Sequence, residues 1–259
     1  MKKHENYWLQ NGASVLWIKE IKLKQVLPKY VLIFFLLSVI GCNKVRNTDP
    51  TIVIKHDKIT SADKSVIDSL GIDQDILILI RNFTDASITP LQRSFNIYSD
   101  SLKTVETIVK NHTGFSFNAE QNEARDIVLQ LKGQLKAKGY LIYISAIHFG
   151  YEPDQVTVLK GMDQFDILRI EETDAINYGL ENGDVIAKLK EWDKAHHFEI
   201  IAADISRVEA IFIDQPKDLK AFSEELYEFC PDIVDQGTGT VKELELELKR
   251  YGILYLWWD

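Results

Sequence analysis

The stretch Tyr140–Phe149, YLIYISAIHF, is mostly apolar at consecutive positions, so both faces of a strand formed here would be apolar. Strands that are buried on both faces lack the alternation of apolar and polar residues seen in half-solvated strands. We therefore expect this strand in the centre of a sheet. Gln155–Lys160 follows across Gly150–Asp154 and is typical of its hairpin partner.

The residues before this strand predict a helix. Asn118 is a suitable N-cap, and Gln121 stands three positions later, as the second residue of a capping box does. Gly139 suits the position just after the end of the helix. Between them, four apolar residues recur at helical spacing: Ile127, Val128, Leu131 and Leu135.

A similar order of elements follows after Asp184. The pattern predicts a helix and then two strands, Phe198–Ala203 and Arg207–Ile213, joined by a tight connection. Helix–strand–strand thus occurs twice, at 122–160 and 184–213, although the side chains match poorly. The repeated order predicts a structural duplication, which the fold can test. Gly161–Gly179, between the two copies, fits either a short helix or a strand.

The C-terminal segment carries clear helix boundaries. Pro216 suits the first position of a helix that Pro231 would end, and Thr240–Glu243 forms a capping box before a second helix. Gly252 would close the second helix. Ile253–Trp258 then has large apolar groups on both faces, so we expect a strand inside the sheet.

The remaining elements lie nearer the N-terminus. The sequence predicts a short helix at Ser61–Gly71, a buried strand at Asp75–Arg81 and a helix at Ser101–Asn111, while Thr51–Lys55 fits a first strand. The expected fold is α+β, with a mixed, mostly antiparallel sheet and helices packed on it, in one unit over 59–259. The alternative is a two-lobed arrangement split near Asn118.

Val31–Cys42, VLIFFLLSVIGC, resembles an export signal. A ten-residue apolar helix reaches about 15 Å, roughly half of a bilayer's hydrocarbon core, so Val31–Ile40 is short for a membrane span. It has the length of the apolar region of a signal peptide. Val39–Cys42 resembles a bacterial lipobox, in which the cysteine receives lipid and becomes the first residue. Four lysines supply the positive charge in front: Lys19, Lys22, Lys24 and Lys29.

These features predict a signal peptide over 1–41, a lipid on Cys42 and a polar tether over 42–58. The region before the apolar run is longer than signal peptides usually have. Two or three acyl chains hold a protein stably on a membrane, whereas one chain binds only marginally. The expected location is the cell membrane or envelope, outside the cytoplasm. The alternative is a core helix or an uncleaved anchor, with Cys42 an ordinary buried thiol.

The composition limits the partners. The chain has a formal net charge of −9, and because residues 1–41 carry six Lys and two Glu, residues 42–259 carry −13. This charge argues against nucleic acid, whose binders need basic patches. It would suit a basic protein partner. Cys42 and Cys230 are the only cysteines, so a lipid on Cys42 would leave Cys230 as a single thiol.

No residue group predicts a metal or a cofactor. Cys230 would lie at a helix C-terminus, where the negative end of the helix dipole disfavours a thiolate. His196 and His197 are adjacent, whereas helical zinc ligands are spaced four residues apart. The acidic loop around Asp232 and Asp235 lacks the spacing of a calcium-binding loop and is more typical of a turn before a helix.

Several segments of the second half resemble a known bacterial family. They are Asp163 with Phe165 and Leu168, then Thr173–Tyr178, Phe229–Asp232 with Gln236–Gly237, and Leu256–Asp259. Together they are similar to the family called domain of unknown function 4253, over Gly139–Asp259 or from as early as Ala119. The resemblance implies no established activity.

The resemblance indicates where to look for a cleft. Its candidate residues are Asp163, Asn177, Tyr178, Cys230, Asp232, Trp257, Trp258 and Asp259. One hypothesis is a membrane-tethered binding or interaction protein, for example an immunity-like protein that neutralises a basic partner. The other is a hydrolase-like enzyme that uses carboxylates or Cys230 in this cleft. A structural reading competes with both, in which Asp232 and Asp259 satisfy backbone donors at segment ends.

Overall fold

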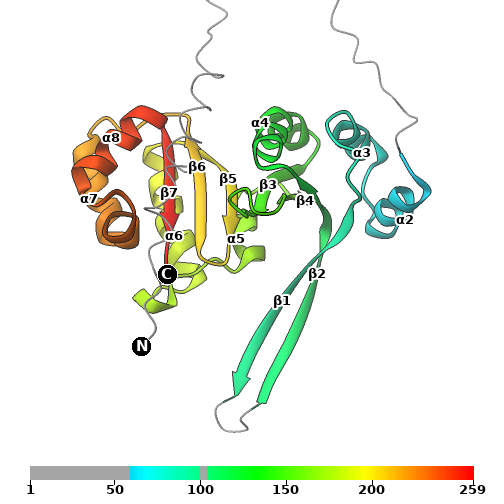
Figure 1. Ribbon diagram of the computed structural model, residues 1–259, viewed down its shortest axis with the longest axis horizontal. Helices are drawn as coiled ribbons and strands as arrows, with labels where there is room; N and C mark the ends of the chain where they lie inside the picture. The colour runs from blue at the N-terminus through cyan, green and yellow to red at the C-terminus, as the bar shows by residue number, and fades with distance from the viewer. Residues whose placement is uncertain (1–58, 100–103) are drawn as a thin grey trace, which may run out of the picture. The chain divides into compact units, whose positions relative to one another are not determined.

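The computed structural model describes residues 59–99 and 104–259, and these described residues belong to one compact unit. Seven strands form a single sheet in the order β1-β2-β4-β3-β5-β6-β7 (Figure 1). Neighbouring strands are antiparallel except β3 and β5, which are parallel. The expected α+β fold with a mixed, mostly antiparallel sheet is confirmed. The strands are β1 Thr89–Ser99, β2 Thr104–Ala119, β3 Tyr140–Ala146, β4 Asp154–Lys160, β5 Phe198–Asp204, β6 Arg207–Phe212 and β7 Ile253–Trp257.

Helices cover both faces of the sheet. They are α2 Ser61–Leu70, α3 Gln74–Arg81, α4 Gln121–Ala137, α5 Phe165–Glu171, α6 Asn182–Ala195, α7 Leu219–Phe229 and α8 Val241–Tyr251, with a 3₁₀ turn η2 at Ile176–Tyr178 and a π-helix η3 at Ile233–Thr238. Among the described residues, none of these helices has the length and apolar character to cross a membrane.

Strand β3 divides two hydrophobic cores, as expected of a central strand. Tyr140, Ile142 and Ile144 pack on one face with α2, α3 and α4. Leu141 and Tyr143 point to the other face, which α5, α6, α7 and α8 cover. We call these the first and the second face of the sheet. The consecutive apolar residues of β3 therefore follow from burial on both sides.

The two helix–strand–strand segments occur as α4–β3–β4 and α6–β5–β6. β3 and β5 lie side by side with Ile144 opposite Ala202, while α4 packs on the first face and α6 on the second. A two-fold rotation along the strands would relate such halves. At one constant offset along the chain, apolar residues correspond in pairs: Ile127 with Val185, Val128 with Ile186, Leu131 with Leu189, Tyr140 with Phe198, and Ile142 with Ile200. This correspondence supports a structural duplication.

Three sequence-based predictions of elements are wrong. Asp75–Arg81 lies in helix α3 and not in a strand. A short apolar run of this kind fits the buried side of a helix as well as a strand that is buried on both faces, so its pattern alone does not distinguish the two. The part of Ser101–Asn111 that the structure describes belongs to β2. Ile253–Trp257 is the edge strand β7 rather than an inner strand. The strand expected at Thr51–Lys55 lies outside the described residues.

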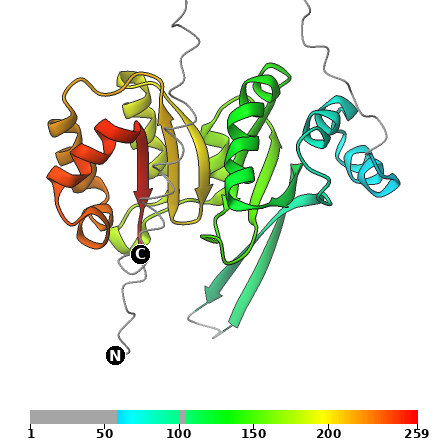
Figure 2. The same ribbon diagram turned by 45° about the horizontal axis from the view of Figure 1, so that its top comes forward.

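Strands β1 and β2 form a hairpin that extends beyond the sheet (Figures 1 and 2). β2 pairs with β4 only through Gly114–Ala119, whereas its pairing with β1 continues to Thr104. At Gly114 a Cβ atom would lie 2.4 Å from the carbonyl oxygen of Val158, so only glycine allows this approach of the two strands.

A buried ion pair joins α2 to α3. The Arg81 guanidinium contacts the Asp63 carboxylate at 2.7 and 3.3 Å, and it also donates to the carbonyl oxygens of Thr84 and Ala86. Asp63 in turn accepts from the backbone N–H of Thr60 and completes the capping box of α2. Burial alone would raise the pKa of Asp63, but the hydrogen bonds from Arg81 and Thr60 outweigh it and lower the pKa.

Asp63→Asn is expected to destabilise the protein by about 2–3 kcal/mol at neutral pH, because it leaves Arg81 as a buried charge without its carboxylate. Since the folded-state pKa of Asp63 is lowered, the ion pair stabilises above the unfolded pKa of about 4 and the effect is lost as pH falls below it. Urea unfolding at pH 7 and pH 3 measures both values. A difference between wild type and variant that does not shrink in acid would contradict this assignment.

Candidate functional site

Residues expected in a cleft converge on the carboxylate of Asp232. Its Oδ1 accepts from the Tyr178 hydroxyl (2.6 Å) and from the Gln236 amide (2.9 Å). Its Oδ2 accepts from the backbone N–H of Asp259 (2.9 Å). The Asn177 amide donates to the carbonyl oxygen of Asp259 (2.8 Å). Asp232 thereby joins η2, η3 and the C-terminus, and we call this group the Asp232 clasp.

The clasp leaves Asp232 little capacity for a ligand. The residue is 4% exposed, and both of its oxygens accept hydrogen bonds within the chain. The hydrogen bond to Asp232, with partial burial, raises the pKa of Tyr178 to about 12. Asp163 does not belong to this group, because it forms ion pairs with Arg169 and Lys190 at the start of α5. The geometry suits the structural reading, in which these side chains fix segment ends.

Cys230 is held in the same region as a packed thiol. It is the C-cap of α7 and is fully buried. Its Sγ donates to the carbonyl oxygen of Trp257 (3.0 Å) and lies 3.4 Å from the Trp257 backbone nitrogen. Trp258 packs nearby, with its ring edge against Phe229. Burial raises the pKa of Cys230 to about 12, so the thiolate needed for nucleophilic attack is scarce at neutral pH.

Asp232→Asn is expected to lower the free energy of unfolding by about 2–3 kcal/mol, because an amide nitrogen replaces one of the two acceptors and faces a donor. Asp235→Asn is the matched control: this exposed residue is in η3, and its Oδ1 accepts from the Tyr227 hydroxyl. The control should change stability by less than about 0.5 kcal/mol. Equal losses in the two variants, measured by urea unfolding, would argue against the clasp.

A second group of polar residues was not predicted from the sequence. Arg125, Asp154, Arg207 and Glu209 are each at most 6% exposed, and we call them the buried charge cluster. Arg125 on α4 forms an ion pair with Glu209 on β6. Arg207, two residues before Glu209, pairs with Asp204. Charged residues are rarely buried without a specific reason, so such a cluster is a candidate functional site.

The cluster lies on the first face, at the sheet end where β3 and β5 finish. Asp154 Oδ1 accepts from the backbone N–H of His148 (2.7 Å) in the loop after β3. Burial raises the pKa of Asp154, although the His148 N–H and the charge of Arg207 act in the opposite direction. The sequence signal for the site was the alternation in β6, where Arg207 and Glu209 flank Val208. That pattern usually indicates a solvated face, which is why the site was missed.

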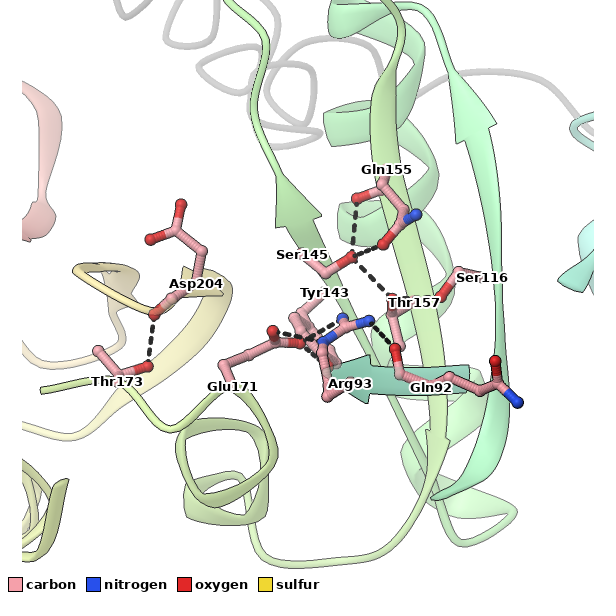
Figure 3. A network of polar contacts seen from close by, with 10 residues as sticks. All are labelled: Gln92, Arg93, Ser116, Tyr143, Ser145, Gln155, Thr157, Glu171, Thr173 and Asp204. Atoms are coloured by element: carbon pink, nitrogen blue, oxygen red, sulfur yellow. Dashed lines mark hydrogen bonds and ion pairs between the residues drawn. The ribbon is translucent and has the colours of Figure 1, made fainter. Parts of the chain in front are cut away.

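A third polar group connects the β1–β2 hairpin to the body of the sheet (Figure 3). Arg93 on β1 contacts both oxygens of Glu171 on α5, at 2.6 and 2.7 Å. The Tyr143 hydroxyl of β3 donates to the same carboxylate. Burial raises the pKa of Glu171, while Arg93 and Tyr143 act to lower it. All of these groups are paired with one another, so we interpret them as a structural link between the β1–β2 hairpin and the rest of the sheet.

Next to that link, hydroxyl groups continue across three strands. Ser116 Oγ lies 2.8 Å from Thr157 Oγ1, which donates to Ser145 Oγ at 2.8 Å. Ser145 also donates to the side chain of Gln155 (2.9 Å). Figure 3 shows these residues in line from β2 through β4 to β3. The chain of hydrogen bonds satisfies polar side chains that the sheet buries.

A surface hollow lies between the end of α6 and the start of α7. Its volume is about 490 Å³ and its lining includes three carboxylates, Asp214, Asp218 and Glu225, beside His196 and Phe222. Glu225 accepts from Lys188 (2.6 Å) and from the Trp192 indole (2.8 Å). His196 packs edge-on against Phe222. Within the described part of the chain, no group of three or more His, Cys, Asp or Glu is placed to hold a metal ion.

The comparisons with known proteins agree with the resemblance in the second half of the chain. A family model described as domain of unknown function (DUF4253) matches residues 155–259, a shorter range than Gly139–Asp259. No curated protein and no solved structure matches the chain significantly. The matched range contains the Asp232 clasp together with Arg207 and Glu209, while β3 and α4 precede it. Residues 155–259 of this chain therefore form a DUF4253 domain.

Proposed function

We propose that the protein is a lipoprotein, tethered to the cell envelope through Cys42, whose described part is a binding domain for a basic protein partner. The observation that carries the tether is Val31–Cys42, an apolar run of signal-peptide length that ends in a lipobox-like cysteine. Neutralisation of a basic partner, as by an immunity-like protein, is the activity that this arrangement suits.

The charge of the chain supports a basic partner. Residues 42–259 carry −13, and complementary charge accelerates association and excludes partners of like charge. The hollow between α6 and α7 offers Asp214 and Asp218 beside the aromatic ring of Phe222. A lysine or arginine side chain could bind there through ion pairs and contact with the ring.

The geometry favours binding over the alternative, which is a hydrolase-like enzyme that acts through Cys230 or through the Asp232 carboxylate. Cys230 is fully buried with a pKa raised to about 12. Both oxygens of Asp232 are engaged by donors of the chain itself. A nucleophile or general base needs an accessible atom with a suitable pKa.

The tether is tested by mass spectrometry of the protein purified from membranes of its native source. We expect an N-terminus at Cys42 that carries acyl chains, and a Cys42→Ser variant that stays unprocessed. An intact N-terminus with an unmodified Cys42 would refute the lipoprotein, whatever the protein binds.

The binding domain is tested by capture of envelope proteins on the purified chain. We expect a basic partner that binds at about 50 mM salt and is released near 500 mM, where screening is strong. Asp214→Asn with Asp218→Asn should weaken capture, and asparagine preserves the N-cap role of Asp218. Glu120→Gln with Glu123→Gln is the control, because both residues are exposed, at the N-cap and in the first turn of α4. A partner held equally at both salt concentrations, or equally by both variants, would contradict the proposal.

A further inference from the structure

The buried charge cluster and the neighbouring residue Tyr255 contain polar atoms that have no hydrogen-bond partner among residues 59–99 and 104–259. They include Asp154 Oδ2, Arg207 Nε and the hydroxyl of Tyr255 on β7. Buried polar groups are rarely left unpaired, because each costs about 1–3 kcal/mol. Three such atoms around the charges of Arg207 and Glu209 point to a bound group that would supply the missing hydrogen bonds.

These atoms face the same region. Glu209 and Tyr255 are opposite each other on paired strands, so their side chains share a face of the sheet. Arg207 is two residues before Glu209 and therefore lies on that face as well. The charges of Arg207 and Glu209 act on Asp154 and also on Tyr255, so each of these two residues lies within electrostatic range of Arg207 and Glu209.

The hydrogen-bonding capacity that remains is mainly that of donors. A guanidinium Nε can only donate, and the tyrosine hydroxyl carries a proton. Glu209 is engaged by Arg125, and Asp204 by Arg207. Burial raises the pKa of Asp154, although the His148 N–H and the charge of Arg207 act in the opposite direction. The matching ligand atom is thus an acceptor, and an oxyanion is the acceptor that guanidinium groups bind best.

The position in the fold agrees with a ligand site. The cluster lies at the carboxyl ends of the parallel strands β3 and β5, where open sheets commonly bind ligands. The loop after β3 brings Phe149 over the Arg207 guanidinium, 5.7 Å from the ring centre. Phe149 is 46% exposed and has φ = 54°, which is strained for a non-glycine residue. It borders the cluster on the solvent side.

We propose that the cluster is a binding site for a small oxyanion, a phosphate or a carboxylate group, held by Arg207 Nε and the Tyr255 hydroxyl. The ion pair of Arg125 with Glu209 joins helix α4 to strand β6 beside the site, and Asp154 lies within electrostatic range of Arg207 and Glu209. The site is separate from the acidic hollow, and it does not depend on the lipid tether or on a protein partner.

The test is isothermal titration of the full-length chain in mild detergent with sodium phosphate and, separately, sodium acetate. Sodium chloride at equal ionic strength is the reference. We expect saturable binding of phosphate or of acetate. The anion that binds more strongly identifies the ligand class as phosphate or carboxylate. Tyr255→Phe and Arg207→Lys should each weaken binding by about 10- to 100-fold, as loss of a hydrogen bond to a charged group does.

Tyr251→Phe is the matched control, because its hydroxyl is also buried without a partner in the described part of the chain, but on α8. Helix α8 packs on the second face, away from the cluster. Tyr255→Phe keeps the ring and removes only the hydroxyl, so it reports on the site even where Arg207→Lys unfolds. Binding no stronger than the chloride reference, or equal losses in Tyr255→Phe and Tyr251→Phe, would overturn the proposal.

Discussion

Deletion of Ile253–Asp259 is expected to abolish cooperative folding. β7 pairs with β6 from Ile253 to Trp257, and three of the deleted side chains are at most 3% exposed in the core of the second face: Leu254, Leu256 and Trp258. Burying each contributes about 1.5–3 kcal/mol, so their sum is comparable to the stability of a whole domain, about 5–15 kcal/mol. The deletion also removes the Asp259 backbone from the clasp and the Trp257 partner of Cys230.

Circular dichroism during heating measures this outcome. The truncated chain should show no cooperative transition and should aggregate, since β6 becomes an exposed edge. A chain that lacks only Asp259 is the control, because it keeps β7 and loses the exposed terminal residue. We expect it to melt cooperatively at a lower temperature, since Asp232 loses one donor. A soluble chain without Ile253–Asp259 that melts in one sharp transition would refute the role of β7.

The elements that could be predicted from the sequence are those with local signals. Gly71 in the left-handed conformation ends α2, and Thr240 caps α8 by accepting from the Glu243 N–H. The apolar residues of Tyr140–Phe149 indicated a central strand, and β3, which spans Tyr140–Ala146, is one. Each of these signals acts over a few residues, so the sequence alone contains it.

Predictions failed where distant residues decide. The apolar residues of Asp75–Arg81 fit two periods, and packing against α4 and the first face selects the helix. Ile253–Trp257 is apolar throughout although β7 is an edge strand. Helices α7 and α8 bury Leu254 and Leu256 on one side, while the three residues of the other side remain half-buried.

The candidate sites show the same division. The family resemblance grouped Asn177, Tyr178, Cys230 and Asp232. In the structure Asn177, Tyr178 and Asp232 belong to the Asp232 clasp and Cys230 is packed in the same region, whereas Asp163 lies elsewhere. The buried charge cluster could not be foreseen in this way. Its central ion pair joins residues 84 positions apart, and the burial of a charged residue on a strand depends on which helix lies above it.

Breaking the ion pair between Arg125 and Glu209 is expected to cause the second large loss of stability. Arg125→Met is expected to destabilise the protein by about 3–5 kcal/mol, because it leaves the Glu209 carboxylate buried without its cation. Glu209→Leu should have a similar cost, since Arg125 then loses its carboxylate. The double variant should be more stable than the sum of the two losses predicts, by about 2 kcal/mol or more, because neither charge remains.

Urea unfolding of the wild type, the two single variants and the double variant gives the coupling energy by a double-mutant cycle. The pair Lys132 and Glu199 is a control of the same type at the surface: Lys132 is also on α4, Glu199 is on β5, and their contact of 2.8 Å is partly exposed. Its coupling energy should be below about 1 kcal/mol, because solvent screens the charges. The coupling energy of an ion pair rises as water is excluded from it. A coupling energy for Arg125 and Glu209 no larger than that of the surface pair would therefore mean that water reaches the buried charge cluster. The oxyanion would then have to compete with water for Arg207 and Tyr255, and its binding would be correspondingly weak.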